Sequence, residues 1–252
     1  MPEDIEKLKA ENEKLQKLSD FKSDVISISA HELRTSLSAL KWILKMFIDG
    51  DIGAISVEQK TFIKKAFESN ERMIGLVNEM LSVNHADDIS LKYTPENVDV
   101  VELVESVLFD FVGESFKKNI QVIFLKGEQK LPKAFVDPYK ARVVLQNLVD
   151  NAIKYSNFGS KIFVSLSIKE NAGKKEIEIA VKDNGIGIPA ADQVKIFEKF
   201  FRAENAKQKN EVGSGLGLTT ARNIVTRWEG KIWFESKEGG GSNFYFTLPV
   251  KN

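Results

Sequence analysis

The sequence of 252 residues contains no cysteine, and this absence removes several kinds of chemistry together. Disulfide bonds, thiolate metal sites and a cysteine nucleophile are all excluded. Histidine is almost as scarce, because the chain has only 2, His31 and His85, so we do not expect a metal site built from several histidines. We interpret His85 as a surface residue, since no chemically active side chain accompanies it.

Long apolar runs and an excess of charge of one sign are also missing. No stretch approaches the ~18 apolar residues of a membrane span, and no signal peptide opens the chain. The 36 basic and 36 acidic side chains cancel, so no overall field attracts nucleic acid or a membrane surface. We therefore expect a soluble, cytoplasmic protein without a nucleic-acid partner. A membrane-anchored parent protein stays open.

Helical patterns occupy the first third of the sequence. Residues 3–20 are rich in Glu, Lys and Leu and carry the alternating three- and four-residue spacing of a coiled coil, although a solvated single helix is the alternative. A helix to about Phe47, a turn over 49–53 and an amphipathic helix over 57–83 predict an antiparallel hairpin. Because the hairpin has more apolar stripe than one helix can cover, we expect two hairpins to pair as a four-helix bundle in a homodimer.

From about residue 98 shorter helices and strands predict a second kind of domain. The expected helices cover 98–117, 138–155 and 216–228, and the expected strands cover 120–125, 161–169, 176–182, 231–236 and 242–250. Residues 86–98 are interpreted as a linker or an edge strand. Helices on one face of a mixed sheet form an α+β sandwich. The fold class is thus an all-α hairpin followed by an α+β domain, with a boundary near residue 90.

A polar helix face in the second half is suited to a nucleotide and its metal. Asn147, Asn151 and Lys154 recur at spacings of four and three on the helix over 138–155, so they share one face. An amide oxygen can bind Mg²⁺, which prefers hard oxygen ligands, and Lys154 brings positive charge for phosphates. A helix with an ordinary solvent-exposed polar face is the alternative.

Two glycine-containing segments extend this hypothesis. Asp183 follows a strand and can accept a hydrogen bond from a base amino group, while Gly185 and Gly187 allow a close approach of the backbone. The alternative is a plain hairpin turn. Residues 213–218 precede a helix, whose free N–H groups can hold phosphate, but they match neither a P-loop nor a dinucleotide fingerprint. We expect 189–213 to be a mobile lid, because its charged centre has no evident apolar face.

A histidine beside a carboxylate lies on the helix of the first half. His31 falls off the apolar stripe, and Glu32 can orient its imidazole or take its proton. Thr35 follows one turn later on the same face and can position a water molecule. A core histidine is the alternative. An acceptor nucleophile together with a nucleotide site predicts phosphoryl transfer.

Residues 21–252 resemble the transmitter region of the sensor histidine kinases of two-component systems. The stretch His31-Glu32-Leu33-Arg34-Thr35 is similar to the phosphoacceptor motif of that family. Four later segments are similar to the N, G1, F and G2 boxes of its Bergerat-type ATPase domain, namely 147–156, 183–189, 197–202 and 213–218. Together with the coiled-coil pattern that precedes it, this resemblance divides the chain into a coiled-coil signalling helix over 1–20, a dimerisation and histidine-phosphotransfer domain over 21–89, and a catalytic ATP-binding domain over 90–252.

The resemblance also implies a role for each matching residue. It makes His31 the phosphorylated residue, Glu32 its acid/base partner and Thr35 an aid to dephosphorylation of the regulator. It makes Asn151 the Mg²⁺ ligand and Arg202 a contact of the γ-phosphate. The remaining residues are implied to bind ATP, with Asp183 reading the adenine amino group: Asn147, Lys154, Tyr155, Asp183, Gly185, Gly187, Gly213, Ser214, Gly215, Leu216, Gly217 and Leu218.

By this resemblance the chain is an ATP- and Mg²⁺-dependent protein-histidine autokinase. It would pass the phosphoryl group to an Asp of a response regulator receiver domain, act as a phosphatase of that regulator, and answer to an upstream sensor domain or protein. One residue departs from the family pattern, because Ser36 stands where proline usually follows the threonine. Serine keeps the N–H that proline lacks and bends a helix only mildly, so the balance between kinase and phosphatase states is in question.

Two other functions remain as alternatives. One is a phosphatase-biased or inactive scaffold, which the replacement at Ser36 keeps open. The other is an ATP-gated conformational machine with the same ATPase fold, against which the helix-borne His-Glu-x-x-Thr block argues. The signal, the identity of the regulator and the choice between cis and trans phosphorylation do not follow from the sequence.

Overall fold

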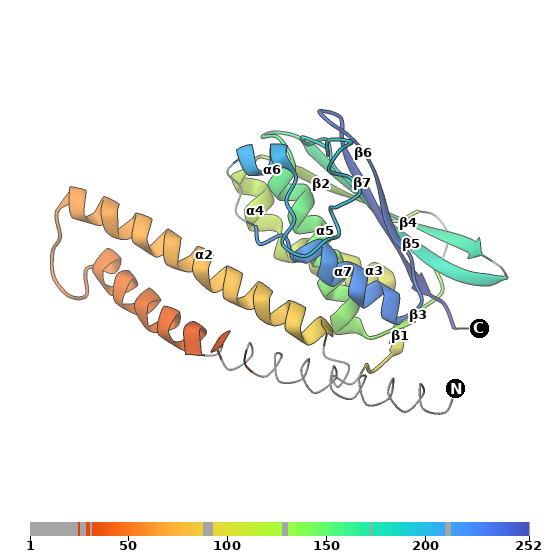
Figure 1. Cartoon of the computed structure of the whole chain (residues 1–252), viewed down its shortest axis with the longest axis horizontal. Helices are drawn as coiled ribbons and strands as arrows, with labels where there is room; N and C mark the ends of the chain where they lie inside the picture. The colour runs from red at the N-terminus through yellow and green to blue at the C-terminus, as the bar shows by residue number, and fades with distance from the viewer. Residues whose placement is uncertain are drawn as a thin grey trace, which may run out of the picture. The chain divides into compact units, whose positions relative to one another are not determined.

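The computed structural model of the protein describes residues 25, 29–30, 32–87, 93–127, 131–171, 173–209 and 213–251. The predicted coiled coil over 3–20 and the candidate phosphoacceptor His31 lie outside these described residues. The chain divides into two compact units, Met1–Leu91 and Lys92–Asn252, and each has a core of its own (Figure 1). None of the described helices combines the length and the hydrophobicity of a membrane span.

The first unit contains the predicted helical hairpin. One helix covers residues 32–49 without a break, and α2 runs from Val57 to Asp87 (Figure 1). A capping box opens α2, because the hydroxyl of Ser56 accepts a hydrogen bond from the Gln59 N–H (3.1 Å) and the Gln59 side chain accepts one from the Ser56 N–H (2.8 Å). These two bonds satisfy donors that the helix itself leaves unpaired, so they fix where α2 begins.

The described part of the hairpin's interior is partly polar. Ala30 and Val77 are buried, Leu37 packs against them, and Asn70 is only 1% exposed. The Asn70 Nδ2 donates to the main-chain carbonyl of Leu37 (2.9 Å), whereas its Oδ1 is buried without a hydrogen-bond partner. Several of the larger apolar side chains of the described helices are instead exposed, among them Leu33, Leu40, Trp42, Ile43, Met46, Phe62 and Met73. The hairpin therefore presents an extensive apolar surface.

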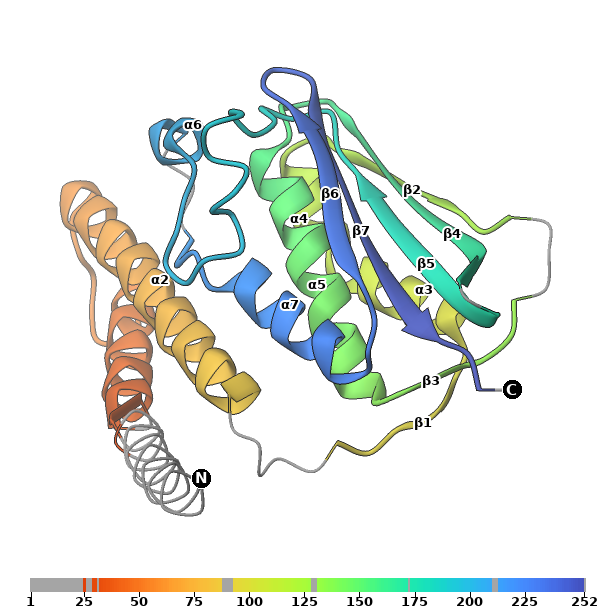
Figure 2. The same ribbon diagram turned by 45° about the vertical axis from the view of Figure 1, so that its right-hand side comes forward.

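The second unit consists of a sheet and a layer of helices on one of its faces (Figure 2). The sheet has the strand order β2-β4-β5-β7-β6, in which β2 and β4 are parallel and the other neighbours are antiparallel. Its strands are β2 (Gln121–Leu125), β4 (Lys161–Asn171), β5 (Lys174–Lys182), β6 (Ile232–Lys237) and β7 (Gly241–Pro249). The helices are α3 (Val100–Asp110), α4 (Val112–Lys117), α5 (Pro138–Tyr155) and α7 (Gly217–Arg227). Two short strands, β1 (Glu96–Val98) and β3 (Ala134–Val136), pair separately.

The core of this unit lies between the sheet and the helices. Alternate residues of the central strands point to it, as the two-residue period of a strand requires. These residues are completely or almost completely buried together with the inner face of α5: Ile162, Val164, Ile177, Ile179, Val181, Phe246, Leu248, Val144, Leu145 and Leu148. Burying each of the larger side chains stabilises the fold by about 1.5–3 kcal/mol. The core therefore holds α5 firmly while its opposite face stays available for a site.

The structure confirms the predicted fold class and corrects several elements. The expected single helix over 98–117 is two helices, because the backbone of Phe111 leaves the helical conformation (φ −96°, ψ 3°) and Val98 belongs to β1. Strand β3 and the short helix α6 (Glu204–Gln208) were not expected. Helix α6 lies in the predicted lid, where Ala203 and Ala206 are buried, so the centre of that segment does have a small apolar face. The bundle of two hairpins and the domain limits at 20 and 89 stay predictions.

Candidate functional site

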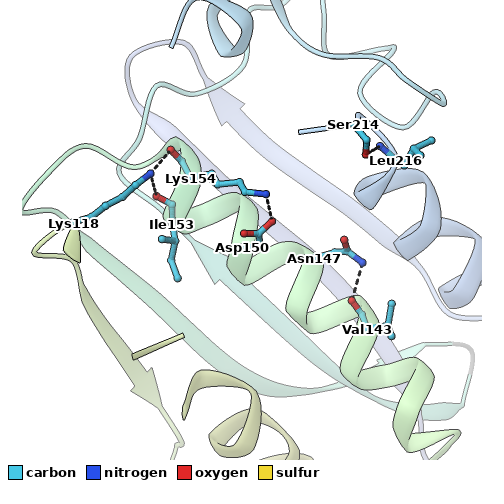
Figure 3. A network of polar contacts seen from close by, with 8 residues as sticks. All are labelled: Lys118, Val143, Asn147, Asp150, Ile153, Lys154, Ser214 and Leu216. Atoms are coloured by element: carbon cyan, nitrogen blue, oxygen red, sulfur yellow. Dashed lines mark hydrogen bonds and ion pairs between the residues drawn. The ribbon is translucent and has the colours of Figure 1, made fainter. Parts of the chain in front are cut away.

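Helix α5 carries the polar face around which the candidate nucleotide site is built. Asp137 caps its start by accepting a hydrogen bond from the Lys140 N–H (3.1 Å), and Pro138 occupies the first turn, where a missing N–H does no harm. Asn147 donates to the carbonyl of Val143 (2.9 Å), one turn earlier (Figure 3). Its Oδ1 lies so close to Gly217 that a Cβ there would stand 2.6 Å away. The predicted N and G2 segments therefore meet at this contact.

Farther along α5, Lys154 forms an ion pair that the sequence analysis missed. Its ammonium lies 2.6 Å from the Asp150 carboxylate, one turn earlier on the same helix (Figure 3). Both side chains are about 30% exposed, at 27% and 31%, so such a pair contributes only ~0.3–0.5 kcal/mol to stability. The spacing of four residues was the signal that could have revealed it. Asn151, which follows Asp150 in the sequence, is half-buried.

The C-terminal end of α5 is capped by two lysines from distant parts of the chain. Lys118 donates to the carbonyls of Ile153 (3.3 Å) and Lys154 (3.2 Å), as Figure 3 shows. Lys209 donates to the carbonyls of Tyr155 (2.8 Å) and Ser156 (2.6 Å). The last carbonyls of a helix have no intrahelical partner and carry a partial negative charge, so cations are favoured there. No sequence signal had linked either lysine to this helix.

Asp183 follows β5 and is a buried carboxylate, only 5% exposed. Its Oδ1 accepts hydrogen bonds from the Gly185 N–H (2.8 Å) and the Ser242 N–H (3.2 Å). Burial raises the pKa of Asp183 from 3.8 to about 6, although the two amide hydrogen bonds and the positive charge of Lys209 oppose that rise. A buried carboxylate with so perturbed a pKa is a candidate for function.

Three of the predicted glycines are required by close packing of the protein itself. A Cβ on Gly185 would lie 2.3 Å from the Tyr155 carbonyl oxygen, and one on Gly187 would lie 1.9 Å from the carbonyl oxygen of Lys237. Gly215 has a φ of 74° and would meet the carbonyl oxygen of Phe201 at 2.6 Å. The glycines thus bring the G1 turn against α5 and the G2 segment against the F segment. Their predicted contact with a nucleotide stays a prediction.

The remaining predicted binding residues lie in the F and G2 segments. Phe200 donates its N–H to the Gly215 carbonyl (3.1 Å), which joins the two segments. Arg202, the last residue of the F segment, donates to the carbonyl of Ala206 on α6 (3.1 Å). Ser214 accepts a hydrogen bond from the Leu216 N–H (3.1 Å) just before α7 (Figure 3).

The G2 side chains differ in what they offer. Leu216 is buried and Leu218 packs against the core, so only their backbone can face a ligand. A Cβ on Gly213 would lie 3.7 Å from the hydroxyl of Tyr155. The G2 segment therefore passes close to the end of α5 as well as its middle.

The phosphoacceptor helix is described only in part. Glu32, Thr35 and Ser36 are exposed on the continuous helix over 32–49, so replacing the family proline by serine leaves no break there. His31 and the side chain of His85 lie outside the described residues. Among the residues that the structure describes, no cluster of three or more His, Asp and Glu side chains can hold a metal ion.

Comparisons with known proteins agree with these two units. Residues 21–88 match the family model of the His Kinase A (phospho-acceptor) domain, and residues 136–252 match that of the Histidine kinase-, DNA gyrase B-, and HSP90-like ATPase. A sensor histidine kinase WalK of Bacillus subtilis (strain 168) is 30% identical over 94% of this chain and 38% of its own length. An adaptive-response sensory kinase SasA of Synechococcus sp. (strain JA-3-3Ab) is 32% identical over 99% of this chain and 65% of its own length.

Solved structures share the fold. The crystal structure of full-length ShkA in complex with AMPPNP has a TM-score of 0.73 over 90% of this chain and 46% of that chain, at 21% identity, which shows the fold alone. The catalytic domain of histidine kinase ThkA is 30% identical and has a TM-score of 0.52 over 64% of this chain and all of that chain.

A phospho-acceptor helical hairpin followed by an ATPase domain of this fold defines a transmitter region. The chain belongs to the sensor histidine kinases of two-component systems, and the resemblance seen in its sequence is confirmed. It spans about a third to two thirds of the length of these curated relatives, 38% of WalK and 65% of SasA.

Proposed function

We propose that this chain is an ATP-dependent protein-histidine kinase that phosphorylates His31 and transfers the phosphoryl group to an Asp of a response regulator. The observation that carries the proposal is the close packing of the G1 segment against α5, of the G2 segment against α5, and of the F segment against the G2 segment, in a chain that also has a phospho-acceptor hairpin. The names of the relatives WalK and SasA, both sensor kinases, support the same activity.

Asp183 is the proposed contact of the adenine base. Both of its described hydrogen bonds go to Oδ1, so Oδ2 is the oxygen that can accept a hydrogen bond from the adenine amino group. A guanine base would present a carbonyl at the same place, and two acceptors cannot pair. Keeping a carboxylate in a buried site costs free energy, which a binding role would explain.

The phosphates are proposed to lie along α5 and at the start of α7. Helix α7 has no side-chain cap, and its first N–H groups are oriented to hold an anion. Asn151 would supply an amide oxygen to Mg²⁺, whose other ligands would come from the nucleotide and water, as this ion prefers. The metal would neutralise phosphate charge, and Lys154 and Arg202 would add positive charge.

The chemistry at His31 follows from general principles. The neutral imidazole attacks the γ-phosphorus, the bond from phosphorus to the ADP oxygen breaks, and Glu32 accepts the proton that the imidazole loses. The phosphoryl group then passes to an aspartate of the receiver domain. Thr35 is exposed on the same helix and would position the water molecule that attacks the phosphorylated aspartate of the regulator and releases phosphate, which is the opposing phosphatase activity.

A homodimer is proposed from the apolar surface of the hairpin. Trp42 and Phe62 are 68% and 64% exposed, on the two helices of the first unit, and large apolar side chains gathered on a protein surface mark an interface. A second hairpin would cover it as a four-helix bundle. Regulation by an upstream sensor and a cytoplasmic location stay predictions.

Incubation with γ-labelled ATP and Mg²⁺ tests this function. We expect acid-labile, base-stable label on the wild-type chain and none on a His31→Gln variant that still binds ATP within a few-fold of wild type. Label on that variant would remove His31 as the acceptor. Regulator dephosphorylation without any labelling would instead favour the phosphatase-biased scaffold, and ATP hydrolysis without labelling would favour an ATP-gated machine.

A further inference from the structure

A single carbonyl at the end of α5 joins three segments of the second unit. The Tyr155 carbonyl accepts hydrogen bonds from the Lys209 ammonium (2.8 Å) and from the N–H of Ile186 in the G1 turn (3.2 Å). A Cβ on Gly185 would overlap the same oxygen, so the turn packs tightly there. Lys209 comes 54 residues after Tyr155 and directly follows α6. A cation from beyond the F segment therefore reaches the corner where the G1 turn meets α5.

Helix α6 contacts both elements that form this corner. The Asn205 Nδ2 donates to the carbonyl of Gly187 in the G1 turn (2.9 Å), and the Lys209 ammonium also donates to the carbonyl of Ser156 (2.6 Å). Ala206 is buried, with 7% of its surface exposed. Figure 2 shows α6 beside the C-terminal end of α5, in agreement with these contacts. The contacts of this segment thus hold the turn that begins with Asp183.

Positive charge reaches Asp183 from the same lysine. Burial raises the pKa of Asp183 from 3.8 to about 6, and two backbone amides and the charge of Lys209 lower it. The amides carry no net charge, and on α5 the ammonium of Lys154 is paired with the Asp150 carboxylate (2.6 Å). Lys209 is therefore the side chain whose charge favours the ionised form of Asp183.

We propose that Lys209 is a positioning residue of the proposed base site, whose ammonium fixes the G1 turn on the end of α5 and stabilises the Asp183 carboxylate that accepts a hydrogen bond from adenine. The inference rests on the proposed function, because it takes Asp183 as the base contact. An ionised carboxyl group only accepts hydrogen bonds, whereas a protonated one also donates. A cation that favours the ionised form should therefore strengthen ATP binding without touching the nucleotide.

Four substitutions separate this role from simpler ones. Lys118→Met removes a cation from the same end of α5, where Lys118 contacts two other carbonyls. Lys207→Met removes a charge from α6 itself, where Lys207 is 55% exposed and pairs with Glu204 (3.2 Å). Lys209→Arg keeps the positive charge, and Lys209→Gln keeps a hydrogen-bond donor without the charge.

The test measures the affinity of each protein for ATP with Mg²⁺ as a function of pH. In the wild type the affinity should fall below about pH 6, where Asp183 becomes protonated. In Lys209→Met and Lys209→Gln the fall should begin at a higher pH, and at pH 7 the Lys209→Met affinity should be about three- to tenfold lower, as expected for a lost charged hydrogen bond. Lys209→Arg, Lys118→Met and Lys207→Met should follow the wild-type profile. Protonation of the nucleotide is the same for every protein, so a shifted profile belongs to the protein.

A double-mutant cycle tests whether Lys209 acts through Asp183. When Asp183→Asn is already present, Lys209→Met should cause a smaller loss of ATP affinity, and that loss should not depend on pH, because the carboxylate is absent. An equal loss at every pH, in both backgrounds, would reduce Lys209 to general support of the fold and overturn the proposal.

Other outcomes also decide the question. Unchanged or tighter ATP binding by Lys209→Met would overturn the role of Lys209 alone, provided that the wild type binds ATP. The same pH shift in Lys118→Met would assign the effect to any cation at the end of α5 and would likewise overturn it. A wild type that binds no ATP would overturn the proposed function itself.

Discussion

Replacing Asp183 by asparagine should strengthen the fold and weaken nucleotide binding at once. The Asn Oδ1 can still accept the hydrogen bonds from Gly185 and Ser242, while the buried negative charge disappears. Since one pKa unit is worth about 1.4 kcal/mol, a pKa raised from 3.8 to about 6 corresponds to roughly 3 kcal/mol at neutral pH. We expect the Asp183→Asn variant to gain about 2–3 kcal/mol in free energy of unfolding at pH 7.

The pH dependence of that gain has a definite sign. Because the folded-state pKa of Asp183 is raised, protonated Asp183 is the form that the folded state favours. Its contribution to stability is complete below the unfolded-state value near 3.8 and is lost as the pH rises through about 6. The two proteins should therefore be equally stable near pH 4, and the advantage of the variant should grow between pH 4 and 6 and then level off.

Urea unfolding measures this difference. A Trp42→Phe background leaves Trp228 and Trp233 of the second unit as the fluorescent probes, since the chain has only 3 tryptophans. Glu238→Gln, at an exposed position of the same unit, is the control for loss of one negative charge. An advantage that is absent at pH 7, or that persists unchanged at pH 4, would refute the reasoning from burial.

ATP affinity should move in the opposite direction. The Nδ2 of the asparagine that Asp183→Asn introduces is a hydrogen-bond donor. In one orientation it would face the adenine amino group, and in the other it would face the two backbone amides, so in either case two donors would oppose each other. A loss of about 2 kcal/mol, or roughly 30-fold in affinity, follows from one unsatisfied buried donor. In the wild type, protonation has a similar effect, so ATP affinity should fall as the pH drops below about 6. A variant with unchanged ATP affinity would remove Asp183 from the base site.

Three further substitutions probe the rest of the molecule. Asn151→Ala should abolish Mg²⁺-dependent ATP binding but leave the dimer intact, as measured by light scattering, because the proposed metal ligand and the hairpin lie in different units. Unchanged labelling with ATP at limiting Mg²⁺ would contradict this. Ser36→Pro should change the autokinase and regulator-dephosphorylation rates more than the ATP affinity, because proline in a helix interior lowers the stability of the helix by about 3 kcal/mol and the nucleotide site lies elsewhere. Equal rates in the variant and the wild type would show that position 36 is neutral. Asn70→Asp should lower the free energy of unfolding of the hairpin by about 2 kcal/mol at pH 7, because a buried carboxylate would face the Leu37 carbonyl. Asn70→Leu should leave it nearly unchanged, and calorimetry distinguishes the two variants.

The elements of the fold that have signals in neighbouring residues could be predicted from the sequence. The bounds of α5 agree with the prediction because Asp137-Pro138 is a strong start signal and the apolar spacing of the following residues is regular. The break between α3 and α4 was missed because Phe111 is an ordinary apolar residue, which gives no sign of a helix end. Strand β3 has only three residues, too few for an alternation to be seen.

The residues of the candidate site also divide into those that local sequence reveals and those whose contacts it does not reveal. Asn147, Asp183 and the glycine segments were found because their types and spacings are characteristic. The contacts of Lys118, Lys209 and Asn70 could not be found, since their partners lie 35, 54 and 33 residues away and are backbone carbonyls that any residue would offer. Chain folding, and not local sequence, decides which carbonyls a distant side chain reaches.

The ion pair between Asp150 and Lys154 would make the proposed binding of phosphate by Lys154 an exchange of counter-ions. In the structure the ammonium already faces a carboxylate 2.6 Å away, so a phosphate that claims it competes with a resident anion. Once the exchange has happened, the negative charges of Asp150 and of the polyphosphate stand close together and repel each other. Mg²⁺ at Asn151, one residue along the helix from Asp150, would be the charge that restores the balance. The same nucleotide should therefore bind weakly as the free anion and well as its magnesium complex. This selectivity would originate in Asp150, which would contact neither the phosphates nor the metal.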